Sequence, residues 1–89
     1  MSRYTITADV IVASKRIFNA TVSYGFDHAC GYFIQVFDPV DPDSLILDKD
    51  SFFDGMNKTG MLETFIAMEI KEMIPDTHIE AITLDLPIP

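Results

Sequence analysis

Apolar and polar residues alternate along the first third of the chain. From Ile17 to Phe26, the even positions are apolar or aromatic, and most odd positions are polar or small. Alternation with a period of two is typical of a β-strand, because successive side chains point to opposite faces. Tyr4–Val12 and Tyr32–Phe37 alternate in the same phase. We therefore predict a three-stranded antiparallel meander with Ile17–Phe26 in its centre.

The register of this meander follows from setting apolar faces opposite each other, because a slip of one residue turns core side chains toward solvent. Between the first two strands, a two-residue loop places even positions opposite odd ones, so the pattern favours a three-residue loop at Ser14–Arg16. The turn at Asp27–Gly31 keeps the same phase. The expected pairs are Val12–Phe18, Val10–Ala20, Ala8–Val22, Ile6–Tyr24 and Tyr4–Phe26, then Phe26–Tyr32, Tyr24–Ile34 and Val22–Val36.

An aspartate-rich segment, Asp38–Asp54, follows the meander. Pro39 and Pro42 exclude a helix at its start. Ser44–Leu47 is compatible with a short edge strand, and Ser51–Asp54 has the form of a capping box that opens a helical turn. A loop of this length in a small domain is more often functional than an average loop.

Apolar residues at helical spacing predict a helix over Met61–Met73, begun at Thr59 or Gly60 and ended before Pro75. Met68 lies off its apolar stripe and is expected to be exposed. Ile79–Leu86 alternates again and predicts a closing strand beside either the first or the third strand. The fold class expected is α+β in the order β-β-β-α-β, as a single domain over 1–89. The inward residues expected are Leu62, Phe65, Ile66, Ile70 and Met73 on the helix, and Ile82, Leu84 and Leu86 on the last strand.

The charge of the chain is strongly acidic and unevenly placed. Fourteen acidic and six basic side chains give a formal charge of −8. Residues 1–26 have a surplus of two positive charges, whereas residues 38–54 hold six Asp against Lys49 alone. An acidic chain repels nucleic acid and anionic membranes and is attracted to basic surfaces. The alternative is that acidity only keeps a small hydrophobic protein soluble.

The cysteine content and the hydrophobic runs indicate a cytoplasmic protein. A single cysteine excludes an internal disulfide framework, which favours a reducing compartment. No apolar run approaches the ~18 residues that a membrane helix needs.

Candidate chemical sites are few. An EF-hand loop beginning at Asp48 fails, because Phe53 stands at the glycine position and Thr59 at the bidentate glutamate position. His28, Cys30 and His78 are too few for a zinc site. A Cys30–His78 catalytic pair needs a contact that nothing in the sequence requires. No cofactor-binding or phosphate-binding motif occurs. We therefore expect that the protein binds no cofactor and is not an enzyme.

These observations favour a small acidic, non-enzymatic binding protein that inhibits or occupies a basic, nucleic-acid-binding partner. Its carboxylates would stand in for phosphates, which supply most non-specific nucleic-acid affinity. In size and charge the chain resembles small acidic α+β proteins that phages encode against host defences, anti-CRISPR proteins included. The partner-binding carboxylates expected are Asp38, Asp41, Asp43, Asp48, Asp50, Asp54, Glu63, Glu69 and Glu72.

Two alternatives belong to other classes. Phe33 and Phe37 face away from the expected core and, with Met68, would serve a structural or assembly subunit that associates through apolar surface. A stable homodimer would favour that function. The six aspartates of the 38–54 segment would alternatively form a non-standard calcium-binding module.

Overall fold

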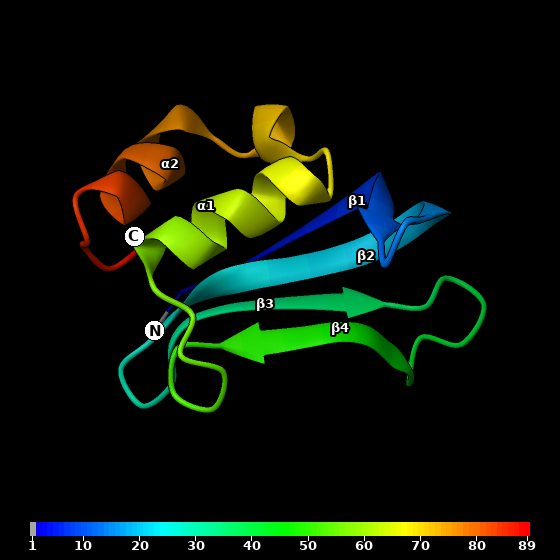
Figure 1. The fold of residues 1–89 in the computed structure, drawn as a ribbon, viewed down its shortest axis with the longest axis horizontal. Helices are drawn as coiled ribbons and strands as arrows, with labels where there is room; N and C mark the ends of the chain where they lie inside the picture. Colours follow the sequence, from blue (N-terminus) through cyan, green and yellow to red (C-terminus); the bar gives the residue numbers. More distant parts are fainter. Residues whose placement is uncertain (1) are drawn as a thin grey trace.

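The computed structural model of the protein describes residues 2–89 and shows a four-stranded sheet covered by helices (Figure 1). All the strands are antiparallel, and their order in the sheet is β1-β2-β3-β4. The helical segments lie together on one side of the sheet (Figure 1). The elements are β1 (Ser2–Val12), β2 (Lys15–Asp27), β3 (Gly31–Phe37), β4 (Leu45–Asp50), α1 (Lys58–Ala67), the 3-10 turn η1 (Lys71–Met73) and α2 (Asp76–Thr83).

The predicted element order is wrong. The chain contains both helix and sheet, but the order is β-β-β-β-α-α rather than β-β-β-α-β. The fourth strand lies inside the aspartate-rich segment, where β4 pairs with β3. The predicted closing strand at Ile79–Leu86 is replaced by α2 and an irregular tail, so β1 and β4 are the two edges of the sheet.

The pairing of β2 with β3 follows the predicted register. Phe26 lies opposite Tyr32, Tyr24 opposite Ile34, and Val22 opposite Val36. The helix-facing residues of these strands are buried because α1 and α2 cover them. The alternation in the sequence therefore identified both the strands and their alignment in the centre of the sheet.

The predicted pairing of β1 with β2 is wrong by two residues up to Ala8 and by three residues from Val10 to Val12. Ala8 lies opposite Ala20, and the loop between the strands has two residues, Ala13 and Ser14. Both loop residues have positive φ angles, 52° and 67°, as a tight hairpin turn requires.

A β-bulge reconciles the two-residue loop with the alternation. Phe18 and Asn19 together lie opposite Asp9, between the pairs Ala8–Ala20 and Val10–Ile17. Asn19 takes a φ of 57°, and its backbone N–H donates to Asp9 Oδ1 at 3.0 Å. The extra residue resets the phase of the strand. Phe18, which the pattern placed in the core, is consequently 60% exposed.

Helix α1 is shorter than predicted. The Asn57 side chain caps its start by accepting from the Gly60 N–H at 2.9 Å. After Ala67 the chain turns through Glu69 at a φ of 61°, and the N–H groups of Glu69 and Ile70 donate to the carbonyls of Ile66 and Phe65. These two bonds form a Schellman motif, so the helix predicted to reach Met73 ends here. Of the residues expected inside, Ile66 and Met73 are exposed.

Helix α2 replaces the expected last strand. Pro75 followed by Asp76 is a helix-start signal, and the buried residues His78, Ala81 and Ile82 follow helical spacing. A second Schellman motif ends α2, with Asp85 at a φ of 60°. Beyond it the chain is irregular, and Leu84 and Leu86 are exposed. The apparent alternation of leucines was therefore misleading.

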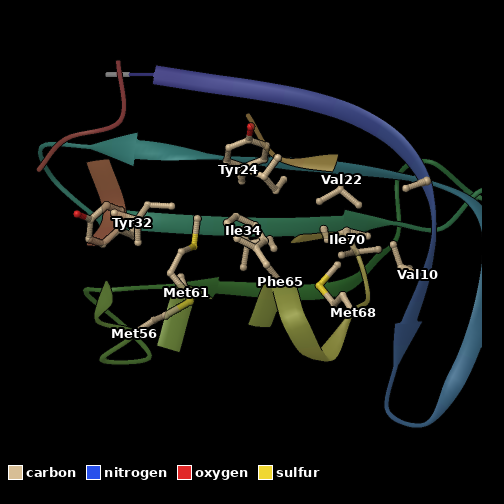
Figure 2. Packing of buried hydrophobic residues seen from close by; sticks show 14 of the residues in the cluster. Val10, Val22, Tyr24, Tyr32, Ile34, Met56, Met61, Phe65, Met68 and Ile70 are labelled. Carbon is tan, nitrogen blue, oxygen red and sulfur yellow. The ribbon is translucent and has the colours of Figure 1, made fainter. Parts of the chain in front are cut away.

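The core lies between the sheet and the helical layer. Figure 2 shows Val22, Tyr24 and Ile34 of the sheet packed toward Phe65 of α1. Met68 lies in the same cluster and is only 2% exposed, so its predicted exposure is wrong. Among residues 2–89, no helix is long and apolar enough to cross a membrane.

Candidate partner-binding surface

The aspartate-rich segment runs along β4, one edge of the sheet. Asp38, Asp41 and Asp43 lie in the loop before β4, Asp48 and Asp50 lie on the strand, and Asp54 lies in the turn after it. The loops stand at opposite ends of the strand (Figure 1). Six residues of this segment form β4. The segment is therefore an edge strand with a loop on each side rather than one long loop.

The carboxylates before β4 order their own loop. Asp38 Oδ1 accepts from the Val40 N–H at 2.8 Å. Asp41 accepts from the Asp43 N–H at 3.3 Å and from the Ser44 hydroxyl at 3.0 Å. Aspartates that accept from the backbone two residues on form tight turns. These side chains are thus held in place while remaining at the surface.

The turn after β4, Ser51–Gly55, is built in the same way and is called the aromatic loop below. Asp50 Oδ1 accepts from the Phe53 N–H at 2.6 Å, and Asp54 Oδ2 accepts from the Asp50 N–H at 2.9 Å. The Ser51 hydroxyl contacts the backbone of Tyr32 and donates to the carbonyl of Met56. The capping box read from the sequence opens no helix here, because its residues close a turn instead.

Phe52 and Phe53, within this loop, are the most exposed aromatic side chains in residues 2–89. They are 70% and 79% exposed, and their ring centroids lie 4.8 Å apart with planes at 84°. Neither residue was predicted as a binding residue. The signal in the sequence is two adjacent phenylalanines outside any periodic segment, in an acidic stretch.

Glu63 of α1 joins the same side of the molecule. Together with Asp54, Lys49 and Thr64, it lines an open groove of about 520 Å³ between β4 and α1. The carboxylates on this side are called the acidic edge below. They are Asp38, Asp41, Asp43, Asp48, Asp50, Asp54 and Glu63.

Glu69 and Glu72 lie on a separate surface. They line a second open groove, of about 610 Å³, with Lys71, Asp76 and the apolar side chains of Ile66 and Ile79. This is the helix groove, formed by the end of α1, η1 and α2. The nine carboxylates predicted from the sequence therefore fall on two surfaces.

Glutamate is an energetically unfavourable residue at position 69, where α1 ends. Glycine is preferred where a helix ends in a left-handed residue, because a β-carbon is strained there. A negative charge is also unfavourable beside the C-terminal end of the helix dipole. An exposed contact with Arg16, at 3.8 Å, is the one salt bridge of Glu69 in the described part of the chain and partly offsets these costs. Residues that break local rules in this way are expected at functional sites.

The aromatic residues expected to form an apolar interface lie on the face of the sheet without helices, but they present little surface. Phe33 is only 7% exposed, because the Arg3 guanidinium lies 4.8 Å from its ring centroid. Phe37 is half-buried. Around them the face is polar, and Arg3 donates to Gln35 at 3.0 Å.

Cys30 and His78 are engaged separately. His78 is buried in α2, with Nδ1 2.7 Å from the Tyr24 hydroxyl and the Tyr4 ring tilted at 45° beside it, 4.2 Å away between centroids. Burial lowers the pKa of His78 and raises the pKa of Tyr24 to about 12. Cys30 lies in the β2–β3 turn, where desolvation and then the charges of Asp27 and Asp50 raise the pKa of its thiol. An activated cysteine needs the opposite shift.

The described residues contain no grouping of three or more His, Cys, Asp or Glu side chains that would hold a metal ion. The calcium hypothesis therefore gains no support from the geometry. Four of its six aspartates, Asp38, Asp41, Asp50 and Asp54, accept from backbone N–H groups, which compete for the oxygens that a cation would need.

Comparisons with protein-family models, curated proteins and solved structures found no match to this chain.

Proposed function

We propose that this protein is a small, non-enzymatic binding protein whose acidic edge occupies a basic, nucleic-acid-binding groove of a partner protein and inhibits it. The observation that carries the proposal is the lack of neutralisation along this edge. Within residues 2–89 the one salt bridge joins Arg16 to Glu69. Within the described residues, none of the seven acidic-edge carboxylates therefore forms a salt bridge with a basic side chain.

Uncompensated like charges have a physical cost. Two unit charges 4 Å apart in water interact by about 1 kcal/mol, and salt screens exposed charges over about 8 Å. Carboxylates gathered along one edge repel one another and lower the stability of the compact state. A basic groove on a partner removes that repulsion on binding, so the same charges that destabilise the free protein favour the complex.

The charge density of the edge indicates what kind of groove fits it. The longest dimension of the molecule is 34 Å. Seven carboxylates spread over that whole length would therefore be spaced about 5 Å apart on average, and this is an upper limit. One strand of DNA carries about one phosphate per 3.4 Å, and the duplex twice that. The acidic edge is closer to a single phosphate backbone than to a duplex. We infer that it occupies a basic groove by charge, without copying the shape of double-stranded DNA.

The competing functions have less support. An apolar assembly subunit would use Phe33, Phe37 and Met68, of which Phe33 and Met68 are buried within the chain. A cysteine nucleophile is disfavoured by the raised pKa of Cys30. The helix groove, with Glu69 and Glu72, is a second acidic surface that a basic partner can contact at the same time.

The test begins by capturing a partner from a cell lysate with the immobilised protein and identifying it. The purified partner is then bound to labelled DNA, and the protein is added as competitor. We expect displacement of the DNA by the parent and a loss of at least ten-fold in potency for the variant Asp41→Asn, Asp43→Asn, Asp48→Asn and Asp50→Asn. Asparagine keeps one side-chain oxygen, with which Asp41 and Asp50 accept a backbone N–H in their turns.

A second variant, with the same net charge as the first variant, serves as the control. It carries Asp9→Asn, Asp27→Asn, Glu80→Gln and Asp85→Asn, all outside the acidic edge and the helix groove, and should compete nearly as well as the parent. Equal loss in both variants would mean that net charge alone matters. A captured partner whose DNA is not displaced would contradict the proposal.

A further inference from the structure

The aromatic loop has an arrangement of side chains suited to a cationic ligand. Phe52 and Phe53 stand nearly perpendicular, at 84°, with their centroids 4.8 Å apart, and both are mostly exposed. Two rings at a right angle present one face and one edge to the same approaching group. An aromatic face attracts a cation because the ring quadrupole is negative there.

Carboxylates flank the two rings and keep accepting capacity. Asp50 and Asp54 each use one oxygen to accept a backbone N–H within the turn. The second oxygen of each of these two carboxylates accepts no hydrogen bond within residues 2–89. No basic side chain of the described part of the chain forms a salt bridge with either of them. The loop thus combines exposed aromatic area with unneutralised negative charge.

The same chain already covers another phenylalanine with an arginine. On the face of the sheet without helices, the Arg3 guanidinium lies 4.8 Å from the centroid of Phe33 and donates to Gln35 Oε1 at 3.0 Å. Phe33 is buried as a result. The aromatic loop has two components of that arrangement, phenylalanine rings and oxygen acceptors, but lacks the third, the guanidinium.

We propose that the aromatic loop binds an arginine side chain presented by the basic partner, an inference that rests on the proposed function and adds its ligand chemistry. A guanidinium is planar, so it stacks on a ring while its edge donates to a carboxylate, in a way that the compact lysine ammonium cannot match. Arginine is also weakly hydrated, which favours it over lysine where an aromatic surface is covered. The loop therefore distinguishes arginine from lysine, whereas the rest of the acidic edge responds to charge alone.

The test uses two peptides as probes, acetylated hexa-arginine and hexa-lysine, titrated into the ¹⁵N-labelled full chain and followed by NMR. Both peptides carry the same charge, so attraction to the acidic edge acts on both. We expect hexa-arginine to bind at least three-fold more tightly than hexa-lysine. It should also shift the amide signals of Asp50–Gly55 most strongly.

Variants separate stacking from charge. Phe52→Leu with Phe53→Leu removes the rings but keeps the apolar character and every carboxylate, so the preference for arginine should fall to within two-fold. Phe18→Leu is the matched control, because Phe18 is also exposed but lies on the hairpin beside Lys15 and Arg16. It should keep the full preference.

Each other result overturns the arginine site. Equal binding of both peptides, with no effect of the leucine variant, would leave the acidic edge as a charge-only surface and its proposed function intact. Binding of neither peptide would also overturn the site, while the DNA competition above would still judge the proposed function separately. Broadening of the loop signals with protein concentration alone would show that a second copy covers the rings. A preference that Phe18→Leu abolishes would place the stacking at the hairpin instead.

Discussion

β1 and β4 are both edge strands, but they differ in how they are protected from the addition of another strand and in the side chains around them. β1 is eleven residues long and is tied to the helical layer by the Ile11 N–H, which donates to the Met68 carbonyl at 3.2 Å. β4 has six residues. It carries the exposed Lys49 opposite Ile34, and a lysine on an edge strand discourages the addition of a further strand.

The surroundings of the two edges differ as well. Arg3, Lys15 and Arg16 lie on β1 and β2, whereas six aspartates and the two most exposed phenylalanines, Phe52 and Phe53, lie on β4 and its flanking loops. On β3, the ring of Phe33 faces away from the core and is covered by Arg3 of β1. In the turn after β4, the rings of Phe52 and Phe53 have no such cover, and the seven carboxylates form no salt bridge within residues 2–89. Ile46 and Leu47 of β4 still pack against the core, and under the proposed function the outer side of this strand is the binding surface.

The largest effect should come from a charge in the centre of the sheet. Val22 is fully buried between Ile6 and Val36. Val22→Asp buries an unpaired carboxylate and should cost about 3–5 kcal/mol, enough to unfold most of the protein. Thr7→Asp, at an exposed position of β1, is the control and should change the melting temperature little. A Val22→Asp variant that melts within a degree or two of the parent would disprove the assigned strand.

A smaller loss should follow Gly25→Ala in β2. A β-carbon at this position would lie 2.1 Å from the Ser2 carbonyl oxygen and 3.0 Å from the Phe33 ring. Because the first of these atoms is backbone, β1 must shift, and we expect a loss of about 1–3 kcal/mol in a denaturant titration. In Gly60→Ala of α1, the β-carbon meets the flexible Met56 side chain at 3.3 Å and Asn57 Oδ1 at an ordinary contact distance of 3.5 Å. This substitution should leave stability level or raise it, since alanine favours helices.

Acid should lower the stability of the fold through His78. Burial lowers its pKa in the folded state, so the unfolded chain takes up a proton near pH 6.5 while the folded one resists. Stability should therefore be fullest above that pH and should fall as the pH drops through this window. His78→Gln should flatten the dependence of melting temperature on pH, whereas His28→Gln should retain it. Equal slopes in all three proteins would contradict the buried site.

The smallest effect on stability is a gain. Glu69→Gly places the preferred residue at the left-handed end of α1 and should stabilise the fold by about 1 kcal/mol. Glu63→Gly, inside the same helix, should instead cost roughly 0.5–1 kcal/mol. If Glu69→Gly destabilises the protein, then the Arg16 contact outweighs the backbone strain, and the case for a functional Glu69 falls.

The sequence predicted the sheet better than the rest of the fold, for a physical reason. Strands β2 and β3 are covered on one side by the core, so their alternation reports which face is buried. The bulge at Asn19 escaped prediction because a local hydrogen bond to Asp9 allows the phase to change between two regular stretches. The end of α1 at Glu69 was missed because a glycine signals such a turn, and here the residue is acidic.

The closing strand failed because short apolar repeats fit two structures. Ile82, Leu84 and Leu86 alternate, but His78, Ala81 and Ile82 also fit one face of a helix, and burial against Tyr24 and Tyr4 decides between them. For the candidate site, charge identified the acidic edge, since carboxylates are visible in any sequence. It could not separate Glu69 and Glu72 from that edge. It also could not show that Phe33 is covered by Arg3 while Phe52 and Phe53 are uncovered, because these facts depend on tertiary contacts.

The most direct test of the central claim is the salt dependence of binding to the identified partner. The dissociation constant is measured for the parent and for the variant with Asn at positions 41, 43, 48 and 50, from about 50 mM to 200 mM salt. If the acidic edge replaces phosphates, the parent should lose affinity steeply with salt, by about a hundred-fold or more over this range. The variant should bind weakly with a shallower slope, while its melting temperature stays level or rises. Tight binding by the variant that is insensitive to salt would contradict the account.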